Sequence, residues 1–375
     1  MMTARVALCA LTLAALAGCC ESTRPTMKKP VPAASVTVPP STRPATLPSA
    51  SAGFQLTGEF AIGGEGGWDY CIADRDAHRL YVPRSDRVMV LDSATGKVLG
   101  TVPGTPGVHG VALAKRLRRG FTSNGADGSV SIFDLDSLAI LGKVPAGNNP
   151  DAIIYDSASK RVFAFSGKSQ DATVIDSAVD PANPVTAGTI ALGGKPEFAV
   201  ADGMGQIFVN IEDTSEIVRL DAATLQVTAR WSIAPGQQPT GLAIDPKTRR
   251  LFAVCGNKLM VVVSADTGKV VTTLPIGSGA DAAAFDPELS LAFASCGDGT
   301  LTVVREDSAD QFSVVQTITT RKGARTMALD SKAHRIYLPT AQFGPAPAAT
   351  ADNPRPRPQM LPETFTIIVV ERPKR

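Results

Sequence analysis

The sequence predicts an all-β fold, a seven-bladed β-propeller that occupies residues 54–371. The first observation is a phrase that recurs seven times, in which an apolar run, an aspartate, a polar turn and a second apolar run follow one another. The second is its spacing of 40 to 46 residues, which is the length of a four-stranded blade. The third is that the last copy lacks its fourth strand, while a strand of that type precedes the first copy.

The recurring aspartate, here called the marker, places the strands of each blade. The marker positions are Asp74, Ala114, Asp156, Asp202, Asp245, Asp286 and Asp330. Each marker stands between the first and second strands, as in IIYD followed by RVFAF. Alternating runs such as RVMVLD and KVLGTVPG supply the third and fourth strands, and Gly and Pro separate the blades.

The two ends of the repeat region complement each other. After its marker the last unit offers RIYL and FTIIVVE, and the chain then ends at Arg375. The segment FQLTGEFAIGG, residues 54–64, has the fourth-strand pattern. We therefore expect residues 54–62 to complete the last blade and to close the ring, which pairs edges that would otherwise be exposed.

The N-terminus has the pattern of an export signal. Residues 1–18 contain Arg5 and then an apolar run that is too short to span a bilayer, which needs about 20 residues. The run ends in LAGC, which resembles the lipobox of bacterial lipoproteins. That resemblance implies cleavage before Cys19 and lipid on its thiol, with Cys20 in place of aspartate favouring an outer membrane. The alternative is an ordinary signal peptide that ends near cysteines.

The flanking segments and the overall charge limit the function classes. Residues 19–53 are rich in Pro, Ser and Thr, which predicts a flexible tether, and residues 372–375 form a short tail. The formal net charge of +2 gives no electrostatic signature of nucleic-acid binding. We expect an exported, monomeric protein held by its lipid anchor on the periplasmic or cell-surface side of the envelope.

The phrases RLYV, VMVLDSATGKVLG and VVVSADTGKVV resemble the YVTN repeat of YncE-like β-propellers. The resemblance covers residues 54–371. It implies a seven-bladed propeller at or beyond the cell envelope, related to the haem-d1-binding propellers of nitrite reductases. The family is functionally mixed and some members carry a DNA-binding label, so the fold does not supply the function.

Seven residues should ring one mouth of the central channel, five positions before each marker. They are Asp69, His109, Asp151, Glu197, Thr240, Asp281 and Arg325. Converging carboxylates suit Ca²⁺ or Mg²⁺, and a histidine would allow a softer metal. The ordinary interpretation is that strand ends at a water-filled mouth are polar, so no cofactor beyond a divalent cation is suggested and the metal ligands stay unassigned.

Turns between second and third strands should lie on the same face as this mouth. Their candidate ligand-binding residues are Asn124, Asn210, Glu212, Asn257 and Asp298. The alternative is turn chemistry, because Asn, Asp and Gly favour tight hairpins whatever the function. In the last blade this turn is a Pro-rich insertion, residues 343–363, which is either a lid or partner-docking segment or a disordered loop.

The cysteines and histidines give weaker signals. Cys255 and Cys296 are equivalent in adjacent blades, which diverge too far for a disulfide, so we expect free, half-buried thiols. Cys71 should be a small core residue. His78 and His334 should lie in exposed turns on the far face, which leaves His109 as the one histidine able to bind haem.

Two classes of function follow. The first is a binding module that takes a small polar ligand or an envelope protein on the channel-mouth face. The alternative is a metal-assisted hydrolase or lactonase in which Asp69, Asp151, Glu197 and Asp281 hold the metal and His109 is the base. Because no nucleophile motif or HExxH is present, we expect no catalytic residues. DNA binding is a weaker third alternative.

Overall fold

The structure is a computed structural model that describes residues 53–350, 356 and 358–372. The chain divides into two compact units, Met1–Pro48 and Ser49–Arg375, and the described residues all belong to the second. The predicted signal peptide, the lipidation site Cys19 and the predicted tether up to residue 52 therefore lie outside the described residues.

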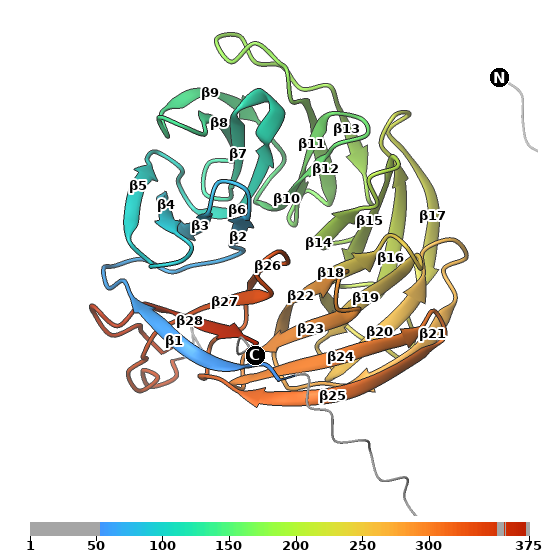
Figure 1. Ribbon diagram of the computed structural model, residues 1–375. Coiled ribbons are helices and arrows are strands. Elements are labelled where there is room, and N and C mark those ends of the chain that lie inside the picture. Colours follow the sequence, from blue (N-terminus) through green and yellow to red (C-terminus); the bar gives the residue numbers. More distant parts are fainter. Residues whose placement is uncertain (1–52, 351–355, 357, 373–375) are drawn as a thin grey trace, which may run out of the picture. The chain divides into compact units, whose positions relative to one another are not determined.

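The second unit is a ring of seven four-stranded antiparallel sheets around a central channel (Figure 1), which confirms the predicted seven-bladed propeller. Strands are given from the channel outward. Blade 1 contains β2 (Ile72–Asp74), β3 (Arg79–Arg84), β4 (Arg87–Asp92) and β5 (Val98–Val102). Blade 2 contains β6 (Val108–Ala114), β7 (Arg119–Asn124), β8 (Ser129–Asp134) and β9 (Ile140–Pro145). Blade 3 contains β10 (Pro150–Asp156), β11 (Arg161–Ser166), β12 (Asp171–Asp176) and β13 (Gly188–Ala191).

The remaining blades follow the same order. Blade 4 contains β14 (Pro196–Ala201), β15 (Gln206–Ile211), β16 (Glu216–Asp221) and β17 (Gln226–Ser232). Blade 5 contains β18 (Pro239–Asp245), β19 (Arg250–Cys255), β20 (Leu259–Ser264) and β21 (Val270–Pro275). Blade 6 contains β22 (Ala280–Asp286), β23 (Leu291–Cys296), β24 (Thr300–Ser308) and β25 (Gln311–Thr319). Blade 7 contains β26 (Ala328–Asp330), β27 (Arg335–Thr340), β28 (Thr366–Glu371) and β1 (Gln55–Ala61).

The ring closes as the sequence predicts. Strand β1 pairs antiparallel with β28, from Gln55 opposite Glu371 to Ala61 opposite Thr366. Just before β1, Phe54 is 2% exposed and its ring meets Phe293 of blade 6 edge-on, with centroids 5.2 Å apart. Residues 54–61 therefore join blade 7 to blade 6 as well as completing blade 7.

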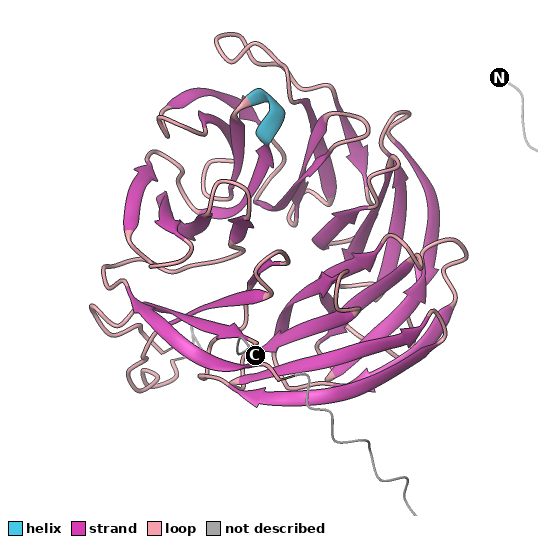
Figure 2. Cartoon of the chain, in the orientation of Figure 1, coloured by secondary structure: helices cyan, strands magenta, loops and turns pink. Residues whose placement is uncertain are grey.

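The marker aspartates are turn residues. In blade 1, Asp74 Oδ1 accepts the backbone N–H groups of Asp76 at 3.1 Å and Ala77 at 3.3 Å, which fixes the turn into β3. The other five marker aspartates bind their own turns in the same way. Blade 2 has Ala114 at the marker position, and a 3₁₀ turn, Lys115–Leu117, stands where the other blades have an aspartate-bound turn. This 3₁₀ turn is the one helix among the described residues (Figure 2).

The TGK phrase of the repeat has a packing reason. Gly96 in blade 1 has φ +73°, and a Cβ there would collide with the ring of Phe60 from β1. Gly268 in blade 5 has φ +72° and meets Trp231 of β17 in the same way. Glycine is needed because the turn is left-handed and because an aromatic ring from the preceding blade's outer strand lies against it.

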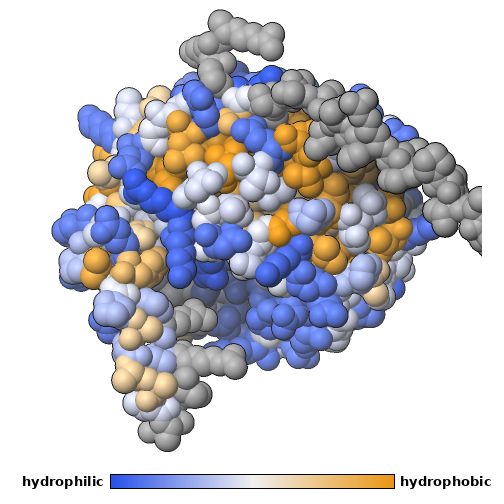
Figure 3. All heavy atoms as spheres, turned by 90° about the horizontal axis from the view of Figure 1, so that it is seen from below, coloured by the Kyte–Doolittle hydropathy of each residue, from blue (hydrophilic) through white to orange (hydrophobic). Residues whose placement is uncertain are grey.

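The core lies within and between the blades, where apolar side chains of the inner three strands are almost entirely buried. The side view in Figure 3 shows hydrophobic residues among hydrophilic ones at the surface. Several of the exposed large hydrophobic residues belong to outermost strands, namely Leu56, Val98, Leu99, Ile140, Leu141 and Val227. Within the described residues, no helix is long and apolar enough to cross a membrane.

Candidate functional site at the channel mouth

The predicted mouth residues of blades 2 to 6 sit at irregularities of their inner strands. His109, Asp151, Glu197, Thr240 and Asp281 are each the second residue of the strand. In every case the pairing with the second strand shifts at this point, for example between Pro150 and Ile153. A β-bulge changes the direction in which a side chain points, whereas in a regular strand the pleat determines that direction. In blades 1 and 7 the equivalent residues, Asp69 and Arg325, precede the shortened strands β2 and β26.

The structure brings three of the mouth residues together. The Nδ1 atom of His109 lies 2.7 Å from Asp69 Oδ2 and 3.6 Å from Asp151 Oδ1. One ligand atom from each of the three lies within 4.8 Å of the others. Burial alone would lower the pKa of His109, but the hydrogen bond to Asp69 and the charge of Asp151 outweigh it and raise the pKa. Burial raises the pKa of Asp151 to about 6.

A second group adjoins this triad. Lys195 Nζ lies 2.5 Å from Glu197 Oε1 and also contacts Glu212. The Tyr70 hydroxyl lies 3.5 Å from Glu197 Oε2. Burial raises the pKa of Glu197 to about 8, against the effect of Lys195, and the charge of Asp151 adds to the rise. Burial and the surrounding carboxylates hold the pKa of Tyr70 well above its usual value, so its hydroxyl remains a donor.

The far side of the mouth carries the third group. Arg325 Nε lies 3.3 Å from Asp281 Oδ2. Burial raises the pKa of Asp281 to about 6. The positive charge of Arg325 offsets part of this rise, and the negative charge of Asp69 adds to it. Thr240 has a different role, since its hydroxyl donates to the backbone carbonyl of Ala280 at 2.9 Å. Six blades thus contribute interacting charged groups to one mouth. Five carboxylates, Asp69, Asp151, Glu197, Glu212 and Asp281, lie there with only two permanently charged cations, Lys195 and Arg325.

Two hollows adjoin these charges. A channel cavity of about 400 Å³ is lined by Tyr70 and by apolar side chains such as Val111, Ile153 and Ala199. A second hollow of about 410 Å³ lies between blades 1 and 2 and is lined by Trp68, Asp69, Asp86 and His109 among others.

The base of the Pro-rich insertion reaches the same face. Phe343 forms a bridge with Met360, and its ring centroid lies 6.0 Å from that of Trp68, the residue before Asp69. Residues 351–355 and 357 of the insertion lie outside the described residues.

Most of the predicted turn residues hold other parts of the protein in place. Asn124 is fully buried and bonds to Ser129 and Ser131 across its own hairpin. Asn210 donates to the carbonyls of Thr240 and Gly241 in the next blade. Asn257 donates to the Pro235 carbonyl and accepts from the Gln237 amide, and Asp298 accepts from the amides of Ser278 and Thr300. These four residues have structural roles, whereas Glu212 joins the charged cluster through Lys195.

Sequence reasoning missed Tyr70, Lys195 and Trp68. The prediction took one residue per blade, five positions before each marker. These three residues lie one or two positions from a predicted mouth residue and were therefore not selected. A signal was present, since Trp68 and Tyr70 flank Asp69 in a sequence with 5% aromatic residues.

The cysteines and far-face histidines partly match expectation. Cys71, Cys255 and Cys296 are free thiols, and Cys71 is a buried core residue as expected. Cys255 and Cys296 are fully buried rather than half-buried, because β19 and β23 are second strands enclosed by their neighbours. His78 lies in an exposed turn. His334 was expected to be exposed as well, but Asp286 Oδ2 holds its Nδ1 at 2.7 Å, so it is only partly exposed.

Comparisons with known proteins identify the fold alone. No family model and no curated protein matches the chain. A chain of Kuenenia stuttgartiensis hydrazine synthase is 14% identical with a TM-score of 0.62, covering 74% of this chain and 94% of that chain. A chain from a crystal structure of a mitotic checkpoint complex is 15% identical with a TM-score of 0.68, covering 92% of this chain and 99% of that chain. At these identities the shared property is the β-propeller architecture.

Proposed function

We propose that this protein is a binding module that holds a positively charged ligand at the channel mouth, with a divalent metal ion on Asp69, His109 and Asp151 as its simplest form. The observation that carries the proposal is the convergence of these three donors, each from a different blade, within 4.8 Å of one another. A propeller fold is compatible with such a module, since loops from all blades meet at one face.

The electrostatics of the mouth support a cation rather than an anion. Asp151, Glu197 and Asp281 all have raised pKa values because they are buried near other carboxylates. A group whose ionised form is disfavoured in this way is stabilised when a cation binds beside it. The Asp151 Oδ1 atom is buried and has no hydrogen-bond partner among the described residues, so it has an unused acceptor facing His109 at 3.6 Å.

The donor set restricts the metal. Two carboxylates and one imidazole suit Mn²⁺, Zn²⁺ or Fe²⁺ better than Ca²⁺, which prefers six to eight oxygen ligands. The imidazole must be neutral and the carboxylates ionised for coordination, so metal binding releases protons. Affinity should therefore fall as the pH drops through about 6, where Asp151 becomes protonated.

The test is isothermal titration calorimetry of the full chain in a neutral detergent with Mn²⁺, Zn²⁺ and Ca²⁺ at pH 7.5 and pH 5. We expect binding of one ion, weakened at least tenfold by Asp151→Asn and by the lower pH. Asp136→Asn, on an exposed turn of the opposite face, is the matched control and should leave affinity unchanged. Absence of binding at pH 7.5, or an equal loss in the control, would refute a metal at this mouth.

A second candidate is metal-assisted hydrolysis, as in the lactonase alternative. In this alternative Asp69, Asp151, Glu197 and Asp281 would hold the metal, and His109 would be the base instead of a ligand. It is favoured by the Asp69–His109 pair at 2.7 Å beside the 410 Å³ hollow, because a histidine oriented by a carboxylate is a usable general base. The metal-loaded full chain should then hydrolyse a panel of lactones, and His109→Gln should abolish turnover. A loaded protein without turnover would leave the binding module as the function.

The cellular setting is part of the proposal. The LAGC sequence supports lipid attachment at Cys19, and the YVTN-like repeat supports placement at the cell envelope. The substitution Cys19→Ser should move the protein from the membrane fraction to the soluble fraction. Mass spectrometry of the N-terminal peptide should then show no acyl chains.

A further inference from the structure

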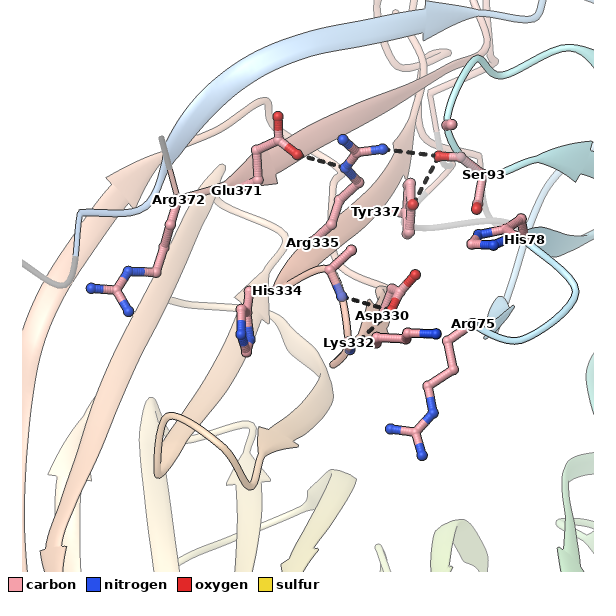
Figure 4. Close-up of a pocket in the computed structure, with 12 residues that line it drawn as sticks. Arg75, His78, Ser93, Asp330, Lys332, His334, Arg335, Tyr337, Glu371 and Arg372 are labelled. Carbon is pink, nitrogen blue, oxygen red and sulfur yellow. Dashed lines mark hydrogen bonds and ion pairs between the residues drawn. The ribbon is translucent and has the colours of Figure 1, made fainter. Parts of the chain in front are cut away.

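A larger hollow lies at the opposite face, where blade 7 meets blade 1 (Figure 4). Its volume is about 970 Å³, more than twice that of either hollow at the channel mouth. It is lined by the turns that follow the markers Asp74 and Asp330 and by the outer part of blade 7. This closing seam plays no part in the function proposed above.

The seam lacks a contact that neighbouring seams have. In three other pairs of blades, a basic residue in one blade's turn binds the marker of the preceding blade. These pairs are Lys115 with Asp74 at 2.7 Å, Arg249 with Asp202 at 2.9 Å, and His334 with Asp286 at 2.7 Å. At the closing seam the equivalent residues are His78 and Asp330, and no hydrogen bond or ion pair joins them in the described structure.

Positive charge exceeds negative charge around the hollow. Arg75, Lys332, Arg335 and Arg372 line it together with Asp330 and Glu371. Glu371 forms an ion pair with Arg335, whose Nε lies 2.6 Å from its carboxylate. Asp330 accepts hydrogen bonds from two backbone amides of its own turn.

Arg75 and Lys332 come from the two sides of the seam, and neither forms an ion pair among the described residues. Arg75 donates to the neutral hydroxyl of Ser331 at 2.9 Å. The charge of Asp76 also acts on both cations, but its carboxylate is paired with Lys115 at 2.8 Å. In Figure 4, Lys332 extends from blade 7 toward the blade that carries Arg75 and His78.

We propose that the closing seam binds a phosphate-bearing anion, held by Arg75 from blade 1 and Lys332 from blade 7, with His78 as a further donor. An arginine fork and a lysine ammonium together suit the multiple oxygens and the negative charge of a phosphate group. The hollow has room for more than the phosphate itself. The same chemistry is offered by soluble phosphorylated compounds and by phospholipid headgroups.

The test is calorimetric titration of the full chain in neutral detergent with two probes at matched ionic strength. Inorganic pyrophosphate represents the soluble source, and glycerophosphoglycerol, a phosphodiester, represents the lipid headgroup. We expect at least one probe to bind, and Arg75→Ala with Lys332→Ala to weaken it at least tenfold. Lys332→Arg should retain most of the affinity, since it keeps the charge. The probe that binds more tightly identifies the source.

The matched control is Lys247→Ala. Lys247 occupies the equivalent position in blade 5, two residues after its marker, with the same backbone hydrogen bond to the marker at 2.9 Å. It should leave affinity unchanged. A readout independent of any variant is the melting temperature of the parent, which a ligand specific for the folded state must raise. No binding of either probe at millimolar concentration, or an equal loss in Lys247→Ala, would overturn the proposal.

Discussion

Ring closure by the N-terminal segment can be tested at a single side chain, Phe54. The change Phe54→Ala removes a ring that is 2% exposed and that packs edge-on against Phe293 at 5.2 Å. Truncating a buried phenylalanine costs about 3–5 kcal/mol of unfolding free energy. That is a large share of the roughly 5–15 kcal/mol by which domains are stable.

The assay is urea unfolding of the full chain followed by circular dichroism at 25 °C. Leu56→Ala is the matched control, because Leu56 lies two residues further along, in β1, but is 43% exposed and should change stability by less than about 0.5 kcal/mol. The backbone hydrogen bonds of Phe54 to Gln316 remain in both variants. A Phe54→Ala variant as stable as the parent would refute the closure argument. So would a deletion of residues 54–62 that melts no lower than a deletion of residues 20–50.

Two further predictions concern buried charges. Arg84 is fully buried, lies 3.7 Å over the ring of Phe365 and donates to backbone carbonyls of residues 63–65, so Arg84→Met should cost about 1–3 kcal/mol in the same urea assay. The partly exposed Arg87 is its control, and Arg87→Met should cost less than about 0.5 kcal/mol. Burial raises the pKa of Glu197 to about 8, so the folded state binds this proton more tightly than the unfolded state, and stability should fall as the pH rises from about 5 to 8. Glu197→Gln should flatten that dependence in urea titrations across the window, and an unchanged slope would contradict the assignment.

The architecture was predictable because it depends on features that repeat. Seven marker turns at blade spacing, and one strand displaced to the other end of the chain, define the ring without any knowledge of side-chain positions. The mouth residues followed from the same counting, because equivalent positions in a propeller must lie around one circle. Counting also placed Asp69 and Arg325 correctly, although they precede their strands.

Counting residues from the markers could not predict which side chains interact within the mouth. Which neighbours meet depends on bulges, as at Asp151, and on side chains that lie outside the equivalent positions. Tyr70 reaches Glu197 from blade 1 to blade 4, and Lys195 joins Glu197 to Glu212. The turn asparagines misled for a related reason. Asn124 and Asn257 are residue types common in binding sites, but Asn124 bonds across its own hairpin and Asn257 bonds to the neighbouring loop at Pro235.

The contrast between the two ends of the inner strands indicates which positions serve the fold and which serve a ligand. Six of the seven markers are aspartate, and each aspartate is needed by backbone amides of its turn, so geometry restricts the residue type there. At the mouth the seven equivalent positions hold five residue types. Apart from Thr240, the charged mouth residues bond to one another's side chains in the hydrogen bonds and ion pairs described above. The fold gains little from burying carboxylates with raised pKa values, since each costs desolvation energy that a cation would recover. Charge that the fold does not need, gathered where seven blades meet, is the argument for a ligand at this mouth.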